Sequence, residues 1–249
     1  MPQERTRERA VDAFILKRTD YGEADQIITL FSKEEGKLRA LVKAAKLPTS
    51  KLQPLLQPLF ETRVTLTGSK ESSGLSKVMG VQLIAAYGGI LESEAKLSAW
   101  YVAAELLIRA LPDNAPNEQL FFELENYAQF LHANELSSEQ VKQSVIQFQI
   151  KAMALLGLGI RTATMANVTH TQSLWFSLDR GGFVNDDSTD AIPIQLDVFE
   201  SFSVMADRPY ADGVDLEPAQ CGPLASLVNR FVTYQLEREI RSHRAFAST

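Results

Sequence analysis

Basic side chains recur at alternate positions in the segment 37–44. Lys37, Arg39 and Lys43 share one parity there, while the other parity is apolar. Side chains of a β-strand alternate between its two faces, so a strand over this segment would present the three cations together. A row of this kind can bind the phosphates of a nucleic acid. A solvated basic strand face is the competing interpretation, and the spacing alone does not decide between the two.

Further candidates for the same function lie before and after this segment. An aromatic ring beside a basic groove can stack on the bases of a single strand. Aromatic residues are more often part of a core, which is what we expect for Phe14, Phe31 and Phe60, whereas Tyr21, beside Gly22, is expected to be exposed. The predicted nucleic-acid-binding residues are Lys17, Arg18, Tyr21, Lys37, Arg39, Lys43, Lys46 and Lys51.

The residues suited to catalysis do not occur at the spacing of any known catalytic or metal-binding motif. The three histidines (His132, His170 and His243) lie far apart and share no ligand spacing with one another or with Cys221. The glycines at 157 and 159 follow a predicted helix instead of preceding one, which is the wrong polarity for a phosphate site. We therefore expect no enzyme active site, no cofactor and no bound metal.

One acidic cluster offers an alternative of another class. Asp186, Asp187 and Asp190 could hold a hard cation, as in a metal-dependent hydrolase. The cluster lacks the twelve-residue calcium-loop pattern and its closing glutamate. A solvated acidic loop is the favoured interpretation.

The charge of the chain changes sign along its length. The whole chain has a formal charge of −6, with 25 Lys and Arg against 31 Asp and Glu. Residues 1–80 contain 14 basic and 10 acidic residues, and residues 81–249 contain 11 and 21. Such a change indicates two units with different partners. The basic unit can bind phosphates although the whole chain is acidic, with an affinity that is sensitive to salt.

The composition also bounds the cellular compartment. The single cysteine, Cys221, excludes an internal disulfide and a cysteine-rich metal site. No run of about 18 apolar residues occurs, so no membrane span is predicted. Residues 1–9 are charged and lack the apolar segment of a signal peptide. We expect a cytoplasmic protein without a membrane partner.

The hydrophobic pattern predicts an α+β protein with two domains. Five short strands are expected at about 10–17, 25–32, 37–44, 60–66 and 75–81, with Gly36 in the turn before the third. Five strands with one long middle connection are typical of a small closed barrel of the OB-fold kind, and an SH3-like barrel would fit almost as well. The first domain is therefore predicted over residues 1–81.

Residues 82–249 are predicted to form a helical domain. Helices are expected from Ser93 to Leu111, around 120–131, and from Ser137, which opens a capping box with Gln140, to about 155. A β-hairpin is expected at 174–184, turning at 179–182. Further helices are expected at about 195–205 and from Pro223, in a first helical turn, to about 244.

Several of these segments together resemble the RecO family of bacterial recombination mediators. The first carries an aromatic-x-Glu turn, a strand ending in Leu-Phe-Ser, a Gly-Lys turn and a basic stretch. The residues that match are Tyr21, Glu23, Leu30-Phe31-Ser32, Gly36-Lys37 and Lys43-Ala44-Ala45-Lys46. Leu56-Gln57-Pro58, the helix ending at 148–159 and the basic segment 240–244 also match, in the order of the family.

The resemblance implies an OB-fold in front of a helical domain and a role as a DNA repair and recombination mediator. It implies binding to single- and double-stranded DNA, strand annealing, and partnership with RecR and single-stranded-DNA-binding protein (SSB) to load the RecA recombinase. By position, it places DNA contact on Lys37, Arg39, Lys43, Lys46 and Lys51. An OB-fold adaptor that binds RNA or protein outside recombination is the alternative.

Two departures from the family pattern affect these expectations. Many members carry four cysteines as a zinc module after the 148–159 helix, but residues 160–184 contain none, so a zinc-free hairpin region is expected at about 160–190. The connection after the third strand is less basic than usual, with Leu47, Thr49 and Ala44 at typical Lys, Arg or Gly positions. We expect weaker intrinsic DNA affinity and more dependence on partners. Lys142 and Lys151 are the candidates for binding the acidic tail of SSB.

Overall fold

A computed structural model describes residues 8–68, 75–162, 174–186, 191–212 and 216–237. The chain forms two compact units, and each is described by itself. Unit 1 contains Met1–Glu92 and Leu107–His132, and unit 2 contains Ser93–Leu106 and Ala133–Thr249. No helix in the described ranges is long and apolar enough to cross a membrane.

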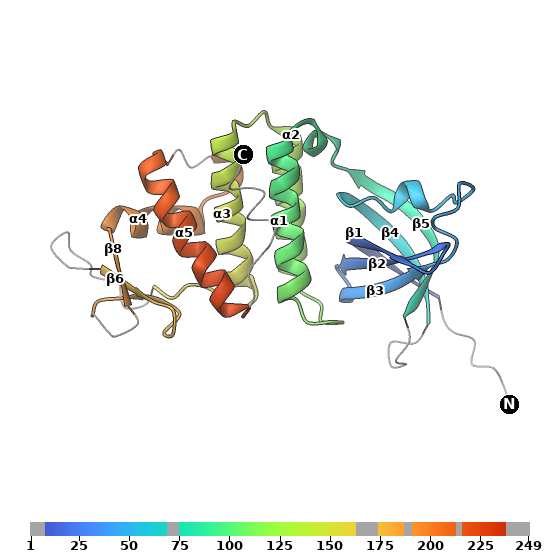
Figure 1. The fold of residues 1–249 in the computed structure, drawn as a ribbon, viewed down its shortest axis with the longest axis horizontal. Coiled ribbons are helices and arrows are strands. Elements are labelled where there is room, and N and C mark those ends of the chain that lie inside the picture. Colours follow the sequence, from blue (N-terminus) through green and yellow to red (C-terminus); the bar gives the residue numbers. More distant parts are fainter. Residues whose placement is uncertain (1–7, 69–74, 163–173, 187–190, 213–215, 238–249) are drawn as a thin grey trace. The chain divides into compact units, whose positions relative to one another are not determined.

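Unit 1 is built around a closed barrel of five strands, drawn in blue to green in Figure 1. The strands are β1 (Arg9–Tyr21), β2 (Asp25–Ser32), β3 (Gly36–Val42), β4 (Phe60–Thr67) and β5 (Ser76–Ala86), in the order β1-β2-β3-β5-β4. A short parallel pairing between β3 and β5 closes the barrel, and the other pairs are antiparallel. The α+β class and the OB-like barrel predicted from the sequence are thereby confirmed.

The barrel interior is filled by the apolar parity of each strand. In β3, for example, Leu38, Ala40 and Val42 are buried, and Arg39 between them is exposed. The remaining interior side chains come from the other strands and from the β3–β4 connection, which contains the short 3-10 helix η1 (Gln53–Leu55). They are Val11, Ala13, Ile15, Ile28, Leu30, Ala45, Leu56, Val64, Leu66 and Val78. Strand alternation therefore fixes which side chains of the barrel reach solvent.

Three strand ends differ from the prediction, and the first of them is that of β1, which was expected to end near residue 17 and runs to Tyr21. Strand β3 ends at Val42, so Lys43 lies in the following turn and not on the strand face. Strand β5 runs to Ala86, although a helical period was predicted from residue 82. The pairs Arg63↔Gln82 and Glu61↔Ala85 continue the ladder between β4 and β5, with one register shift between them. Cross-strand pairing overrides the local period of the sequence here.

Gly36 marks a close approach between the barrel and the segment before α2 (Glu118–Ala133). Its φ of +72° lies in the left-handed region, and a Cβ atom on it would lie 2.0 Å from the carbonyl oxygen of Ala115. Directly after it, the carbonyl oxygen of Lys37 accepts a hydrogen bond of 2.8 Å from the backbone N–H of Asn114. Only glycine satisfies both the conformation and the space at this turn.

Helix α2 packs on the outer face of the barrel through aromatic rings. The ring of Phe121 lies 5.4 Å from that of Phe14 and 5.7 Å from that of Phe31, measured between centroids. Phe14 and Phe31 are fully buried, so the prediction that they belong to a core is confirmed. They form a second apolar layer between the barrel and α2, separate from the barrel interior.

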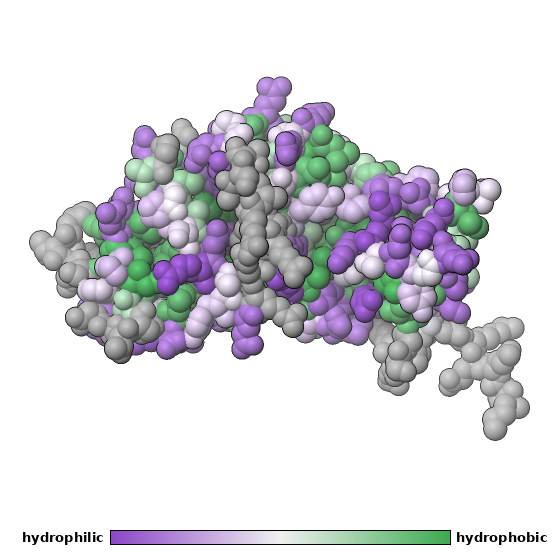
Figure 2. Space-filling view, in the orientation of Figure 1, coloured by the Kyte–Doolittle hydropathy of each residue, from purple (hydrophilic) through white to green (hydrophobic). Residues whose placement is uncertain are grey.

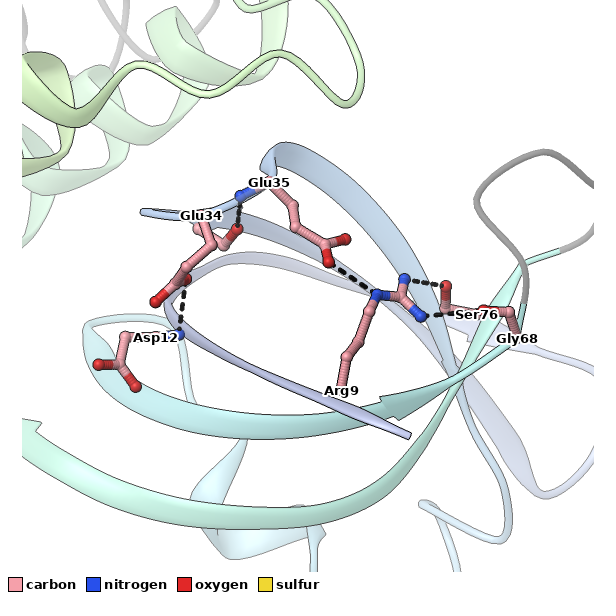
Figure 3. A network of polar contacts seen from close by, with 7 residues as sticks. Arg9, Asp12, Glu34, Glu35, Gly68 and Ser76 are labelled. Atoms are coloured by element: carbon pink, nitrogen blue, oxygen red, sulfur yellow. Dashed lines mark hydrogen bonds and ion pairs between the residues drawn. The ribbon is translucent and has the colours of Figure 1, made fainter. Parts of the chain in front are cut away.

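A polar network around Arg9 joins the start of β1 to the β2–β3 turn and to the two residues that flank the β4–β5 connection (Figure 3). The Arg9 guanidinium donates to Glu35 Oε1 at 2.7 Å, to the carbonyl oxygen of Gly68 at 2.9 Å and to Ser76 Oγ at 2.9 Å. Glu35 belongs to the β2–β3 turn, and Gly68 and Ser76 flank the β4–β5 connection. Because the pairing between β3 and β5 is short, Arg9 supplements it with charge-assisted hydrogen bonds.

Glu61 is a buried carboxyl on β4, and its partner Tyr87 contacts Phe14 of the aromatic layer between the barrel and α2. The Tyr87 hydroxyl donates to Glu61 Oε2 at 3.0 Å, and the Tyr87 ring stacks on Phe14. Burial raises the pKa of Glu61 above its ordinary value of 4.5, and the Tyr87 hydrogen bond opposes this rise. The pKa of Tyr87 is raised, first by its own burial and then by the Glu61 charge. The ionised form of Glu61 is therefore less favourable in the folded protein than in the unfolded chain.

The Glu61→Gln variant is expected to be more stable than the wild-type protein at pH 7. A carboxyl whose pKa is raised on folding contributes stability below its unfolded pKa, and that contribution is lost as the pH rises through the folded pKa. The free-energy difference between the variant and the wild type should therefore shrink as the pH falls from 7 toward 4.5. Urea unfolding of both proteins across this range measures the difference. The exposed Glu92→Gln variant should stay within about 0.5 kcal/mol of wild type throughout, and a Glu61→Gln difference that is independent of pH would contradict the account.

Unit 2 combines helices with a small sheet of order β7-β6-β8. Its described elements are the first part of α1 (Glu94–Ala110), α3 (Ser138–Leu155), β6 (Leu174–Ser177), β7 (Gly182–Val184), β8 (Ala191–Ile194), α4 (Leu196–Asp207) and α5 (Pro218–Gln235). Helix α5 packs against α3 and α4. The Phe176 ring contacts the rings of Phe183 and Phe231, so the hairpin of β6 and β7 is fixed to α5 by aromatic packing.

The predicted capping box and hairpin of unit 2 are present. Ser137 Oγ accepts from the backbone N–H of Gln140, whose side-chain oxygen accepts from the N–H of Ser137. Strand β8 was not predicted, because a short strand with a proline after an acidic loop gives no alternating pattern. The start of the last helix was predicted wrongly. Pro218, not Pro223, takes its first turn, where a second capping box over Glu217 and Gln220 satisfies the free backbone groups.

Candidate nucleic-acid interface

Lys17, Thr29 and Arg39 form a row across three neighbouring strands on the outer face of the barrel. Lys17 pairs with Thr29, and Thr29 pairs with Arg39, in the registers β1–β2 and β2–β3. The residues that flank Thr29, Ile28 and Leu30, point into the barrel interior, so the row points outward. Lys17 and Arg39 are exposed. Their backbones are two strand spacings apart, which is about 10 Å.

A β-bulge puts Lys17 into this row. The register between β1 and β2 shifts after Ile15, which pairs with Leu30, and Leu16 is the extra residue. Strict alternation from Ile15 would turn Lys17 toward the barrel interior, because Ile15 is one of its core residues. The inserted residue reverses the parity of the strand beyond it. The end of β1 therefore presents Lys17 outward and turns Arg18, opposite Ile28, inward.

Lys77 extends the row and was missed by the sequence analysis. Leu41 has the same parity as Arg39 in β3, and Lys77 is its partner in the parallel pairing with β5. Lys77 is exposed. Among the described residues, none of Lys17, Arg39 and Lys77 takes part in an ion pair. We call these three residues the cationic face.

Two of the predicted cations, Lys43 and Lys46, are instead held by carboxylates of the same unit. Lys43 Nζ lies 2.6 Å from Asp25 Oδ2, and Lys46 Nζ lies 3.4 Å from Asp20 Oδ2. The hydrogen bond from Lys43 is the main cause that holds the pKa of Asp25 below its usual value, so that carboxylate stays charged. Exposed pairs of this kind contribute little to stability and can exchange for a phosphate. Lys43 and Lys46 therefore present less free charge than the sequence suggests.

The Lys37 side chain is held by contacts within unit 1. Its ammonium group donates to the carbonyl oxygen of Ile108 at 2.9 Å and lies 3.2 Å from Asp113 Oδ1. Only 15% of its side chain is exposed. The parity argument placed Lys37 and Arg39 on one face correctly, but the carbonyl group of Ile108 in α1 and the carboxylate of Asp113 after α1 take up the charge of Lys37.

The other predicted residues surround the end of the barrel where β1 meets β2. Tyr21, the last residue of β1, is 53% exposed, in agreement with its predicted exposure. Lys51 is exposed and makes no ion pair within the described residues. Arg18 is half-buried, and its Nη1 is buried without a hydrogen-bond acceptor among the described atoms. The barrel thus gathers Tyr21, Lys43 and Lys46 near the start of β2, whereas Lys37 lies at the other end of the β2–β3 ladder, opposite Phe31.

The two candidates for partner binding lie on different sides of one helix. Lys142 and Lys151 are nine residues apart on α3, which turns them about 180° from each other. The Lys151 ammonium lies 4.6 Å from the centroid of the Tyr210 ring, a cation–π contact within unit 2. The two cations therefore do not form one patch.

The residues considered for catalysis are not assembled into a site in the described ranges. His132 Nδ1 accepts a hydrogen bond of 2.9 Å from the backbone N–H of Gly89, which is a structural role. Asp186 pairs with Arg180, and Asp187 and Asp190 lie outside the described residues, as do His170 and His243.

No group of three His, Cys, Asp or Glu side chains in the described part of the chain could hold a metal ion. Burial raises the pKa of the Cys221 thiol to about 12, so this cysteine is mostly in its unreactive thiol form.

Comparison with known proteins places both units in one family. The model of the N-terminal part of recombination protein O matches residues 7–87, and the model of its C-terminal part matches residues 92–244. A curated DNA repair protein RecO of Pelotomaculum thermopropionicum is 26% identical over 243 residues, which are 93% of this chain and 91% of the relative. The RecO protein of Bifidobacterium animalis is 26% identical over 246 residues, covering 94% and 96%. That of Geobacter metallireducens is 35% identical over 124 residues, half of each chain. The chain therefore belongs to the recombination protein O (RecO) family.

Proposed function

We propose that this chain is a DNA repair and recombination mediator without an active site of its own. It binds single- and double-stranded DNA, promotes strand annealing, and acts with RecR to load RecA onto strands coated with SSB. Membership of the RecO family supports a role in DNA repair and recombination. The cationic face of Lys17, Arg39 and Lys77 is the observation that carries DNA binding, because it offers phosphate-binding groups that pair with no carboxylate among the described residues.

Binding at this face would rest on the release of counterions. Each phosphate that a cation neutralises steepens the dependence of log affinity on log salt by about 0.7 for a single strand and about 0.9 for a duplex. The backbones of Lys17 and Arg39 are far enough apart for the two cations to reach different phosphates. Because Asp20 and Asp25 hold Lys46 and Lys43, the intrinsic affinity is modest, and partners contribute to placing the protein on DNA.

The site for those partners belongs to this proposal as well. The acidic tail of SSB requires a cation beside apolar side chains. Lys151 is engaged with the Tyr210 ring, whereas Lys142 makes no ion pair among the described residues, so Lys142 is the better of the two candidates on α3. Its contribution is separable from DNA binding, because Lys142 lies in unit 2 and the cationic face lies in unit 1.

The proposal is tested by the annealing of complementary single strands coated with SSB from the same organism. Adding the wild-type protein should accelerate annealing, and a variant with Lys17→Glu and Arg39→Glu should not. Equal annealing rates with and without the wild-type protein would refute the mediator function. Direct binding to DNA and to RNA of the same sequence distinguishes the alternative, since an RNA-binding adaptor would prefer the RNA strand.

A further inference from the structure

A pocket lies at one end of the barrel, between the end of β1, the start of β2 and the β3–β4 connection. It has a volume of about 470 Å³, within the range typical of small-ligand sites. The β3–β4 connection, which follows β3 in light blue in Figure 1, is held in place by backbone hydrogen bonds. The N–H of Lys46 donates to the carbonyl oxygen of Ala24, and the N–H of Ser50 donates to that of Leu47. The pocket is therefore formed before any ligand arrives.

The polar groups that line the pocket can both donate and accept hydrogen bonds. Gln26, Ser50 and Gln53 contribute two side-chain amides and a hydroxyl, and one N–H of the Gln26 amide is engaged, since its Nε2 donates to Asp20 Oδ1 at 3.0 Å. The Gln53 backbone is held by Ser50 Oγ and by the Gln57 side chain, but its own amide makes no hydrogen bond with the described residues. A side-chain amide can pair in a bidentate manner with a heterocycle that presents an adjacent donor and acceptor, as the edge of a nucleobase does.

The remaining walls suit the faces of a flat ring. Leu47, Pro48 and Pro54 line the pocket, and Leu47 is 46% exposed although it is apolar. At the rim, Lys46 and Asp20 form an ion pair, so the rim carries no net charge from these two groups. A neutral ring with a polar edge fits such a pocket better than a phosphate group does.

Two cations that make no ion pair with the described residues flank the pocket along the sequence. Lys51 directly follows the lining residue Ser50, and Arg18 lies two residues before Asp20 with the same parity on β1. The buried Nη1 of Arg18 lacks an acceptor among the described atoms. Figure 2 shows many hydrophilic residues on the side of the barrel that faces the viewer. A strand with a phosphate against the exposed Lys51 would bring its bases to the mouth of the pocket.

We propose that this pocket is a base-binding subsite, which takes one unstacked nucleobase of a single strand through Gln53, Gln26 and Ser50, between the apolar side chains of the β3–β4 connection. The inference rests on the proposed DNA-binding function and adds a second mode of contact to it. Proteins that bind single strands commonly hold splayed bases in this way. Duplex DNA, whose bases are paired and stacked, would use the cationic face without filling the pocket.

The test compares two single-stranded oligomers of equal length, one with bases and one made of abasic sites. Their affinities are measured for the wild-type protein, for Gln53→Ala and for Gln82→Ala, an exposed residue of β5 outside the pocket that serves as the matched control. Gln53→Ala should weaken binding of the base-containing oligomer about tenfold, in keeping with the loss of one bidentate pair, and leave binding of the abasic oligomer unchanged. Gln82→Ala should change neither affinity. Gln53→Leu, which keeps the size of the side chain, replaces Gln53→Ala if the alanine variant does not fold.

The two proposals fail in different ways. If the wild-type protein binds both oligomers but Gln53→Ala affects both equally or neither, the subsite is refuted while DNA binding stands. If the wild-type protein binds neither oligomer, the proposed function fails, and the subsite fails with it.

Discussion

Replacement of both Lys17 and Arg39 by glutamate is expected to weaken single-strand binding about a hundredfold. Each cation can make a charge-assisted hydrogen bond to phosphate, and two such bonds at about 1.5 kcal/mol each correspond to a loss of this size. Fluorescence anisotropy with a labelled oligomer at fixed salt measures the loss. Lys43 is a less informative target than the sequence suggests, since Asp25 already holds its ammonium group.

The control for this experiment keeps the change in net charge and moves it to unit 2. Arg208 and Arg230 are exposed, and neither makes an ion pair within the described residues. A variant with Arg208→Glu and Arg230→Glu should bind the oligomer within a few-fold of wild type. Equal losses in the two double variants would mean that net charge, and not the cationic face, sets the affinity.

The Gly36→Ala substitution is expected to lower the free energy of unfolding by about 3 kcal/mol. The left-handed conformation alone costs an alanine about 1 to 2 kcal/mol. The added Cβ would also lie 2.0 Å from the carbonyl oxygen of Ala115, so the segment between α1 and α2 must move away from the β2–β3 turn. That movement weakens the hydrogen bond between Asn114 and Lys37 as well. Urea unfolding followed by circular dichroism measures the change.

Gly22 provides a matched control for the close approach. Its φ of +63° is similar, but a Cβ atom on it would meet nothing within 4 Å. Gly22→Ala should therefore cost only the conformational part, about 1 kcal/mol. If both substitutions cost the same, the contact between the Gly36 turn and Ala115 does not contribute to stability.

Local patterns in the sequence were sufficient to predict most of the barrel. The alternation of Leu38, Arg39 and Ala40 predicted which side of β3 is buried, and Gly36 predicted the turn before it. The capping box of Ser137 and Gln140 predicted the start of α3. These features depend on contacts between near neighbours in the chain, and such contacts leave a direct trace in the sequence.

Features of the candidate site that depend on distant residues were not predictable in this way. The bulge at Leu16 turns Lys17 outward, and no glycine or other local signal marks it. Lys77 joins the face through the parallel pairing of β5 with β3, which are separated by a long connection. Lys37 is neutralised by Asp113, 76 residues further along the chain. A count of charges along the sequence therefore overestimates the free charge of Lys37 and misses Lys77.

The pocket combines both kinds of information. Gln53, Pro54 and Ser50 are close in sequence, but Gln26 and Asp20 reach them only because the β3–β4 connection covers the end of the barrel. The sequence around each of these residues has no distinctive local pattern, so there was no reason to select them from the sequence. Their relevance follows from the shared space that they enclose and from the Gln53 amide, which makes no hydrogen bond with the described residues.

The slope of log affinity against log salt is the most direct measurement of phosphate contact at the cationic face. For a single strand, neutralising Lys17 and Arg39 as Lys17→Gln and Arg39→Gln should reduce the slope by about 1.4, which is two contacts at about 0.7 each. The matched variant with Arg208→Gln and Arg230→Gln should keep the wild-type slope. A slope that is unchanged by the loss of Lys17 and Arg39 would show that these cations do not contact phosphates, and would contradict the account.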